Sequence, residues 1–151
     1  MSTIRHLDLD TGTETTLPVD PDLQGTYLGG SGLGARLLAE ADPHLFPLHP
    51  GLPLVLSVGP LTATGFPGAN RVCISGVSPL TGLTASSWMG GDFGTALARS
   101  GTLSLVLEGK APEPSIVYVC EEGTRVEPRP DLWGLTVSET RAALERDYPR
   151  L

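Results

Sequence analysis

Four short runs of apolar and β-branched residues, bounded mostly by glycine or proline, constrain the fold of this 151-residue chain most strongly. They occupy residues 54–58, 71–77, 103–108 and 115–119. β-branched residues suit the pleated, half-buried surface of a strand, and glycine or proline at the boundaries ends it. An alternating amino-terminal segment, residues 3–19 with a turn at 10–12, adds a predicted β-hairpin. The sequence therefore predicts a sheet-dominated core.

Helical patterns are few and short. The segment 32–41 places three leucines on one face of a helix. They are Leu33, Leu37 and Leu38. The segment 136–148 begins with a capping box and continues with apolar residues at helical spacing, which predicts an amphipathic helix at the periphery. Between the two helices, the proline-rich segment 44–53 is predicted to be a connector.

Length, composition and charge limit the function classes. The chain is long enough to bury one core, and we treat residues 1–151 as a single domain. Its apolar runs fall far short of the roughly 20 residues that span a bilayer, so no membrane crossing is expected. A net charge of −7 argues against nucleic acid as a partner, because binding phosphates needs a basic face. The first residues lack the pattern of a signal peptide, so a cytoplasmic location is predicted.

The residue types that most often bind metals or perform catalysis are scattered. Cys73 and Cys120 are too far apart for a zinc or iron–sulfur motif, and both are predicted to be packed strand positions. His44 and His49 fall in the connector, where exposed positions are expected. No Ser/His/Asp or Cys/His set with an activated nucleophile is apparent, so we assign no catalytic residue and no metal ligand.

Glycine-rich segments indicate where an anion would bind. Residues 65–71 and 85–91 are predicted to be loops that converge from neighbouring strands. Glycine lets main-chain N–H groups approach a ligand closely, and Arg71 offers a planar fork of donors that suits phosphate. Together with apolar neighbours, these loops suit a flat, heteroaromatic, phosphorylated cofactor.

Two further patterns leave alternatives open. The glycines of residues 29–34 precede the first helix, as in phosphate-binding loops, but a turn that packs the helix against a sheet is at least as compatible with them. The tripeptide Pro-Leu-Thr follows a predicted strand at 60–62 and again at 79–81. The repetition predicts two related turns at the same edge of a sheet, unless the tripeptide simply recurs in turn-rich sequence.

Several segments carry, in order, a family resemblance that covers nearly the whole chain. They are residues 27–38, Gly59-Pro-Leu-Thr62, Arg71, Ser78-Pro-Leu-Thr-Gly82, Gly90-Gly-Asp-Phe-Gly94, 107–111 and 132–134. In this order and spacing they resemble the amino-terminal domain of the tungsten-containing aldehyde ferredoxin oxidoreductases. The resemblance implies an α+β, sheet-rich domain of two β-sheets with a few short helices. In that family it is the base for a tungsten ion chelated by two pyranopterins, whose phosphates are bridged by magnesium.

The resemblance also implies an activity and partners. The family oxidises aldehydes to carboxylates and passes electrons through a [4Fe–4S] cluster to ferredoxin. This chain resembles a C-terminally truncated version, without the two helical domains that carry the cluster ligands. A tungsten or molybdenum bis-pyranopterin with magnesium is therefore expected only in an assembled enzyme. The implied partners are a polypeptide carrying the missing domains, or a second copy of the chain, and ferredoxin for the assembled enzyme.

The resemblance assigns four cofactor-binding residues: Arg71, Trp88, Gly90 and Gly91. Arg71 matches an arginine that binds pterin phosphate, and Gly90, the first of a glycine pair, matches a pterin-contacting glycine. Trp88 falls where the family usually has an asparagine linked to magnesium, a contact that the family suggests is made through the main-chain carbonyl. Ser31 stands where an arginine is common.

We therefore predict a tungstopterin-binding base that turns over aldehydes only with complementary domains. The alternative is a non-catalytic remnant or protein-interaction module that keeps the fold. The isolated chain is expected to hold no stoichiometric tungsten, molybdenum or iron. An exposed apolar patch is also predicted, and with it self-association or partner binding. Its residues are Phe66, Trp88, Met89 and Phe93.

Overall fold

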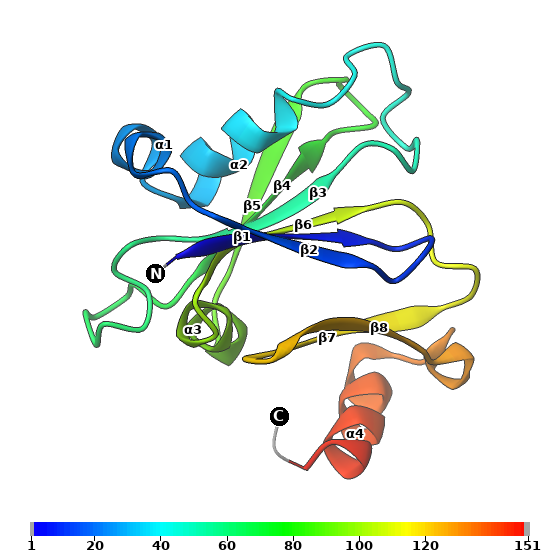
Figure 1. Ribbon diagram of the computed structural model, residues 1–151. Coiled ribbons are helices and arrows are strands. Elements are labelled where there is room, and N and C mark those ends of the chain that lie inside the picture. Colours follow the sequence, from blue (N-terminus) through cyan, green and yellow to red (C-terminus); the bar gives the residue numbers. More distant parts are fainter. Residues whose placement is uncertain (1, 150–151) are drawn as a thin grey trace.

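A six-stranded sheet forms the centre of the computed structural model, which describes residues 2–149 (Figure 1). Its strands are β1 (Thr3–Asp8), β2 (Glu14–Pro18), β3 (Leu54–Val58), β4 (Val72–Val77), β5 (Thr84–Met89) and β6 (Thr102–Glu108). Their order across the sheet is β2-β1-β6-β3-β4-β5. A second sheet is the hairpin of β7 (Ser115–Cys120) and β8 (Gly123–Pro128). The predicted α+β class with two sheets is confirmed.

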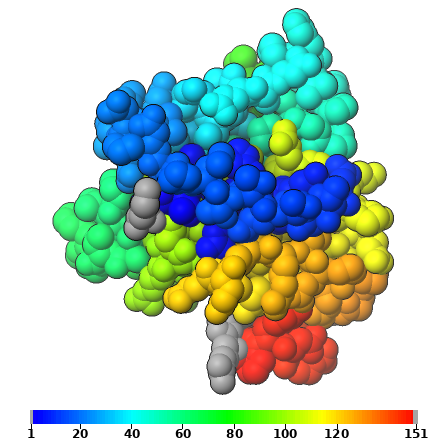
Figure 2. Space-filling model, in the orientation of Figure 1, coloured from blue at the N-terminus to red at the C-terminus, as the bar shows by residue number. Residues whose placement is uncertain are grey.

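Helices and the small sheet cover the two faces of the central sheet. The helices are α1 (Pro21–Tyr27), α2 (Gly30–Leu38), α3 (Asp92–Arg99) and α4 (Val137–Asp147), with a 3-10 turn, η1 (Pro130–Leu132). Helices α1 and α2 lie on one face, whereas α3 and the β7–β8 hairpin lie on the other, with α4 beyond the hairpin (Figure 1). In the view of Figure 2, the edge strand β2 crosses the front of the molecule above the hairpin.

Strand β6 is the most deeply buried strand because it has a neighbour on each side and cover on both faces. It pairs with β1 in parallel and with β3 antiparallel. All other pairs in the two sheets are antiparallel, including the predicted amino-terminal hairpin of β1 and β2. The strand predictions at 54–58, 71–77, 103–108 and 115–119 match β3, β4, β6 and β7 to within one residue at each end.

Helix α2 lies unusually close to the sheet. Its predicted apolar face, Leu33, Leu37 and Leu38, is buried in the core. A Cβ added at Gly34 would lie 2.5 Å from Ser75 Oγ, so only glycine allows this approach. Small hydroxyl side chains lie beneath the helix, where Ser75 and Ser86 share a hydrogen bond of 3.0 Å. Glycine on the helix and serine on the strands therefore set the distance between the layers.

Arg5 connects the central sheet to the second sheet. Its side chain is only 5% exposed. The guanidinium donates hydrogen bonds to the carbonyl oxygens of Cys120 (2.9 Å), Ser100 (3.2 Å) and Glu121 (3.3 Å). A further bond of 3.4 Å reaches Thr124 Oγ1. These acceptors replace the water that the buried cation loses on folding.

Two α-helices and two strands were not predicted: α1, α3, β5 and β8. Strand β5 is exposed throughout and β8 has a single buried residue, so neither shows the apolar pattern of a buried strand. Helix α3 begins directly after Gly91, where the predicted glycine-rich loop of residues 85–91 ends. A signal for α1 was present, since Asp20 caps its amino terminus and Pro21 occupies its first turn.

The prediction that the two Pro-Leu-Thr turns share one edge of a sheet is wrong. Strands β3 and β4 are antiparallel, with Val58 opposite Val72. The segment 60–62 therefore follows β3 at the end where β4 begins, whereas 79–81 follows β4 at the opposite end. Turns after consecutive antiparallel strands always lie at opposite ends.

The boundaries of the two predicted helices shift slightly. Helix α2 begins at Gly30 and ends at Leu38, rather than spanning 32–41. The predicted capping box of α4 is confirmed, because the Thr136 N–H donates to Glu139 Oε2 (2.8 Å) and the Glu139 N–H donates to Thr136 Oγ1 (3.4 Å). No described residue of α4 is buried, so the helix is peripheral as predicted.

Candidate cofactor site

Arg71 and the Gly90–Gly91 pair lie at the same end of the central sheet. Strands β4 and β5 pair with Val72 opposite Met89, so Arg71 immediately precedes this pair and Gly90 immediately follows it. The predicted convergence of the two segments is therefore confirmed, although residues 85–89 belong to strand β5 rather than to a loop. The role of these residues in binding a cofactor stays a prediction.

Arg71 carries an isolated positive charge. It is the only Lys, Arg, Asp or Glu between Asp42 and Asp92. Its side chain is exposed, and none of the ion pairs or side-chain hydrogen bonds within residues 2–149 involves its guanidinium. Its main-chain N–H donates to the Ala69 carbonyl (2.8 Å). The guanidinium is therefore free to bind an anion in the fork geometry that phosphate favours.

Gly90 and Gly91 are glycines for different reasons. Gly91 has φ of 101°, a conformation that side chains disfavour, and it is the N-cap residue of α3. Gly90 has no such backbone constraint, and a Cβ added to it would meet no atom within 4 Å. The packing of the described chain does not require glycine at this position. A glycine there leaves room for a group from outside to approach the main chain.

Two helices begin at this end of the sheet without a side-chain cap. The N-cap residues of α2 and α3 are Gly29 and Gly91, neither of which provides a side-chain hydrogen bond. By contrast, Asp20 caps α1 and Thr136 caps α4. Main-chain N–H groups and the positive end of the helix dipole at α3 therefore lie next to the segment that carries Gly90.

The glycine run before α2 is largely explained by packing. A Cβ on Gly29 would lie 2.3 Å from the Val58 carbonyl oxygen, and one on Gly32 would lie 2.9 Å from the Tyr27 carbonyl oxygen. Of the two alternatives for residues 29–34, the structure favours a turn that packs the helix onto the sheet. The run nevertheless lies at the same end of the sheet as Arg71, because β3 and β4 meet there.

Trp88 is positioned by the start of α2. Its indole ring packs against Gly30, where an added Cβ would lie 2.9 Å from Trp88 Cη2. Trp88 pairs with Cys73 across β4 and remains 51% exposed. The side chain therefore packs against the glycines at the start of α2, while the main chain continues from Trp88 to Gly90.

The predicted apolar patch is only partly confirmed. Phe66, Trp88 and Met89 are exposed. Phe93 instead packs against the core from the first turn of α3, because a helix over 92–99 turns this side chain towards the sheet.

A groove that the sequence did not predict joins the candidate site to α4. It has a volume of about 650 Å³. Gly91 and Asp92 line it together with Leu135, Leu144 and Arg141. Helix α4 therefore borders the segment that holds the glycine pair. No sequence signal connects residues about fifty positions apart in this way.

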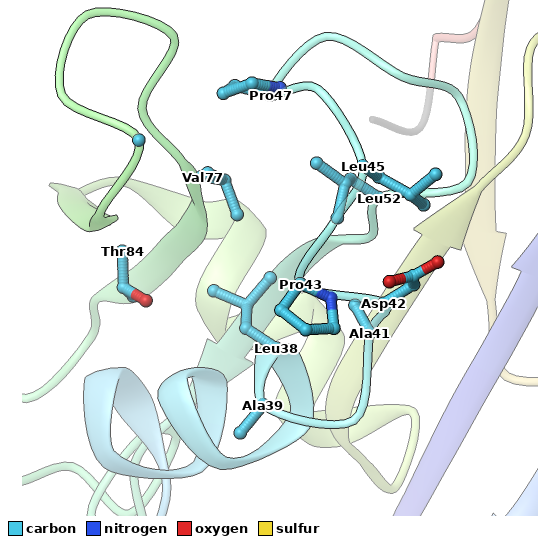
Figure 3. Close-up of a pocket in the computed structure, with 11 residues that line it drawn as sticks. Leu38, Ala39, Ala41, Asp42, Pro43, Leu45, Pro47, Leu52, Val77 and Thr84 are labelled. Atoms are coloured by element: carbon cyan, nitrogen blue, oxygen red, sulfur yellow. The ribbon is translucent and has the colours of Figure 1, made fainter.

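A second cavity, of about 390 Å³, lies at the other end of β4 (Figure 3). The end of α2, the connector and the start of β5 surround it, with Leu38, Leu52 and Thr84 among its lining residues (Figure 3). Val77 pairs with Thr84 at this end of the strands. The length of β4 separates this cavity from Arg71 by roughly 17 Å, at 3.4 Å per residue. It is therefore not part of the candidate site.

Within residues 2–149, no three His, Cys, Asp or Glu side chains lie close enough together to hold a metal ion. Cys73 and Cys120 occupy strand positions, as predicted, and the Cys120 thiol donates to the Gly123 carbonyl (3.3 Å). None of the helices in the described part of the chain is long and apolar enough to cross a membrane.

Comparison with known proteins identifies the family. The model of the aldehyde ferredoxin oxidoreductase N-terminal domain matches residues 4–150. The chain belongs to this family. The tungsten-containing aldehyde ferredoxin oxidoreductase of Pyrococcus furiosus is 36% identical over 143 residues, which are 94% of this chain and 24% of that protein. The protein of the same name from Thermococcus kodakarensis is 34% identical over 143 residues, with the same coverage.

A solved structure shares the fold of this family member. A chain of the active-site complex BamBC of benzoyl coenzyme A reductase, determined with 1,5-dienoyl-CoA, superposes with a TM-score of 0.92 at 30% identity. The match covers 98% of this chain and 23% of that chain. The described fold therefore spans about a quarter of the length of the relatives it matches.

Proposed function

We propose that this domain is the base on which a tungsten or molybdenum bis-pyranopterin rests in an assembled oxidoreductase of the aldehyde ferredoxin oxidoreductase family. Arg71 would bind a pterin phosphate, and Gly90 and Gly91 would let the cofactor approach the main chain. The observation that carries the proposal is that β4 and β5 bring an arginine with no ion-pair partner among residues 2–149 next to a glycine that the packing of these residues does not require.

The donor groups at this end of the sheet fit a phosphorylated, flat group. An exposed guanidinium and uncapped helix N–H groups favour an anion. The exposed side chains of Trp88 and Met89 add apolar surface for a heteroaromatic ring system. When bound, the metal would supply the redox chemistry that converts an aldehyde to a carboxylate. The residues described here would hold and orient the cofactor, and none is assigned a catalytic role.

Trp88 would lie beside the magnesium ion that accompanies the pterin phosphates. An indole provides no metal ligand, so the contact from this position would come from the main-chain carbonyl. The Trp88 ring leans on Gly30 and would hold this part of β5 in place. Since Ser31 supplies no positive charge at the start of α2, Arg71 would be the main cationic contact from this region.

Turnover would require polypeptide beyond these 151 residues. The relatives are about four times as long, since the matched part is 24% of their length. A complementary polypeptide would supply the [4Fe–4S] cluster ligands, close the cofactor cavity and dock ferredoxin. We place the assembled enzyme in the cytoplasm and treat residues 1–151 as one domain of it.

A second candidate function is a non-catalytic interaction module. The exposed apolar side chains between residues 43 and 91 favour it, because large exposed apolar patches mark interfaces. Co-expression with a polypeptide carrying the missing domains distinguishes the two functions. A cofactor base would acquire metal and pterin in the complex, whereas an interaction module would bind its partner without either.

The test compares Arg71 variants in that co-expressed complex. Arg71→Lys keeps the charge but loses the fork of donors, and Arg71→Ala loses both. Tungsten, molybdenum and pterin per complex should fall in the order Arg, Lys, Ala, with cofactor affinity lowered about tenfold or more in the alanine variant. Arg146→Ala, on the exposed face of α4, is the matched control and should leave the content unchanged. Equal cofactor content in all variants, at unchanged thermal stability, would remove the phosphate assignment.

A further inference from the structure

The loop that leads to Arg71 is long for a β-hairpin. It comprises residues 59–71 and joins β3 to β4, whose ends pair as Val58 with Val72. Hairpin loops usually have about two to five residues, and long loops without a helix or strand are commonly functional. A loop of this length has many accessible conformations unless its own contacts restrict them. The hydrogen bonds within the loop therefore decide how firmly Arg71 is positioned.

Thr62 is the buried anchor of this loop, since it is only 7% exposed. Thr62 Oγ1 accepts a hydrogen bond from the Gly59 N–H (3.2 Å) and donates one to the Ala69 carbonyl (3.0 Å). The same Ala69 carbonyl accepts a hydrogen bond from the Arg71 N–H (2.8 Å). One hydroxyl thus connects the start of the loop with the carbonyl that binds the main chain of Arg71.

Asn70 makes a second connection across the loop. Its Oδ1 accepts a hydrogen bond from the Ala63 N–H (3.1 Å). Ala63 has φ of 66°, a left-handed conformation that residues with a Cβ adopt rarely. Strain of this kind persists only where the surrounding contacts hold it, and it concentrates at functional sites. Because Asn70 directly precedes Arg71, both connections end within two residues of the cation.

We infer that Thr62 and Asn70 are positioning residues, which fix the main chain of Arg71 so that its guanidinium meets a phosphate without first ordering the loop. The inference rests on the proposed function, since it takes Arg71 as the phosphate-binding residue. Binding to a preorganised loop avoids a loss of conformational entropy that would otherwise weaken affinity. The role is indirect, and neither side chain is assigned a contact with the cofactor.

The second Pro-Leu-Thr turn shows that the tripeptide alone does not create this anchor. Thr81 is exposed, and its Oγ1 accepts a hydrogen bond from the Leu83 N–H (3.3 Å), two residues along the chain. Thr62 instead reaches Ala69, seven residues along the chain. Thr81 is therefore the matched control for Thr62, with the same local sequence but without the connection across a loop.

The first test measures the purified chain, without any cofactor. Thr62→Val keeps the shape of the side chain but removes its hydroxyl, and Asn70→Ala removes the acceptor of the Ala63 N–H. Each should raise the amide hydrogen-exchange rates of Ala63 and Arg71 about fivefold or more, because the loop opens more often. Thr62→Ser should restore the protection, and Thr81→Val should leave both rates unchanged. Unchanged rates in Thr62→Val and Asn70→Ala would overturn the inference.

The second test measures tungsten, molybdenum and pterin in the complex co-expressed with the missing domains. Thr62→Val should lower the content about fivefold or more at unchanged thermal stability, and Thr62→Ser should restore it. A loss that Thr62→Ser fails to restore would overturn the inference, because packing rather than the hydroxyl would then be responsible.

Arg71→Ala separates this inference from the proposed function. A low content in Arg71→Ala together with a normal content in Thr62→Val and Asn70→Ala would overturn the positioning role alone and leave the proposed function in place. A normal content in Arg71→Ala would overturn the phosphate assignment, and the positioning role with it.

Discussion

The segment 43–91 and the carboxyl-terminal segment 115–149 have surfaces of opposite character, one apolar and the other charged. The first contains Arg71 as its only charged residue, counting Lys, Arg, Asp and Glu. It nevertheless exposes many large apolar side chains: Phe46, Leu48, Leu54, Leu61, Phe66, Leu80, Leu83, Trp88 and Met89. The second is rich in charged residues, most of which are paired with one another. The difference indicates which surface is built for water and which is built to be covered.

Ion pairs and hydrogen bonds connect β8, η1 and α4. Arg129 binds Asp131 through two bonds of 2.9 and 2.8 Å and reaches Asp147 on α4 (2.9 Å). Tyr148 donates to Glu127, which also accepts from Arg125. These bonds, first from Tyr148 and then from Arg125, lower the pKa of Glu127 below its usual value. The helix is therefore attached by polar contacts rather than by a buried apolar face.

The segment 43–91 has no comparable network of ion pairs and hydrogen bonds. Its strands β3 and β4 contribute to the core, but its loops and β5 place apolar side chains in solvent. Charged residues are depleted at the centres of protein interfaces, and aromatic residues and methionine are enriched there. The segment thus has the composition of an interface, with one cation placed at the end where the cofactor is proposed to bind.

Removing the connection between the sheets should have the largest effect. Arg5→Ala leaves the carbonyl groups of Ser100, Cys120 and Glu121 without their donor, and it should lower the free energy of unfolding by about 3 kcal/mol or more. Urea titration measures the loss, and hydrogen exchange should show the β7–β8 hairpin weakened more than β3 and β4. Arg5→Lys should recover part of the loss. An equal loss of exchange protection in the hairpin and in β3 and β4 would show that the two regions do not unfold separately.

Overpacking the contact between α2 and β4 should have an intermediate effect on the free energy of unfolding. Gly34→Ala introduces a Cβ 2.5 Å from Ser75 Oγ, which forces the helix away from β4 and should cost about 1–3 kcal/mol in unfolding free energy. Ser75→Gly in the same chain should restore part of that stability in urea titrations. Gly25→Ala, at an open position of α1, is a matched control with no expected loss. Equal stability of the Gly34 and Gly25 variants would contradict the close packing described here.

Acidification should loosen the carboxyl-terminal segment first. Hydrogen bonds from Tyr148, Arg129 and Thr136 lower the pKa values of Glu127, Asp131 and Glu139, respectively. A lowered pKa in the folded state means that the stabilisation is fully present above the pKa of the unfolded chain. It is lost as pH falls through the lowered folded-state pKa values. Because these groups are exposed, we expect a modest effect, restricted to β8 and α4.

Amide exchange at pH 7 and at about pH 3 measures this effect, since carboxylates titrate between these values. The amides of α4 should lose protection before those of β3, because residues 43–91 contain no carboxylate side chain. Glu127→Gln should reduce the pH dependence at α4. Simultaneous loss of protection throughout the chain would contradict the local character of the network.

The smallest effect on stability should come from adding charge to the uncharged surface. Leu80→Glu, at a position 92% exposed, should change the free energy of unfolding by no more than about 0.5 kcal/mol. It should also reduce association at high concentration, as measured by light scattering. Leu33→Ala, at a fully buried position, is the contrasting control and should cost about 2–5 kcal/mol. A large loss from Leu80→Glu would show that this leucine packs within its own chain.

Periodicity and local signals determined much of the fold. The alternation of β1 and β2, the buried runs of β3, β4, β6 and β7, the three leucines of α2 and the capping box of α4 were all readable. Each depends on interactions between residues close in sequence or on burial of a whole strand. Strand β5 was not readable, because an exposed edge strand needs no apolar pattern. Its neighbour β4 holds it by main-chain hydrogen bonds that leave no trace in residue type.

The candidate site was likewise predictable only in part from the sequence. Sequence order and residue type alone singled out Arg71 and the glycine pair, since a lone cation among glycines is unusual. Only the antiparallel pairing of β4 with β5 brought them to one end of the sheet, and only tertiary packing separated Gly90, which the chain leaves open, from Gly34, which it requires. The groove beside α4 and the buried contacts of Arg5 likewise depend on residues far apart in sequence. Long-range strand pairing and packing fix such contacts, whereas local patterns record only the environment of each residue.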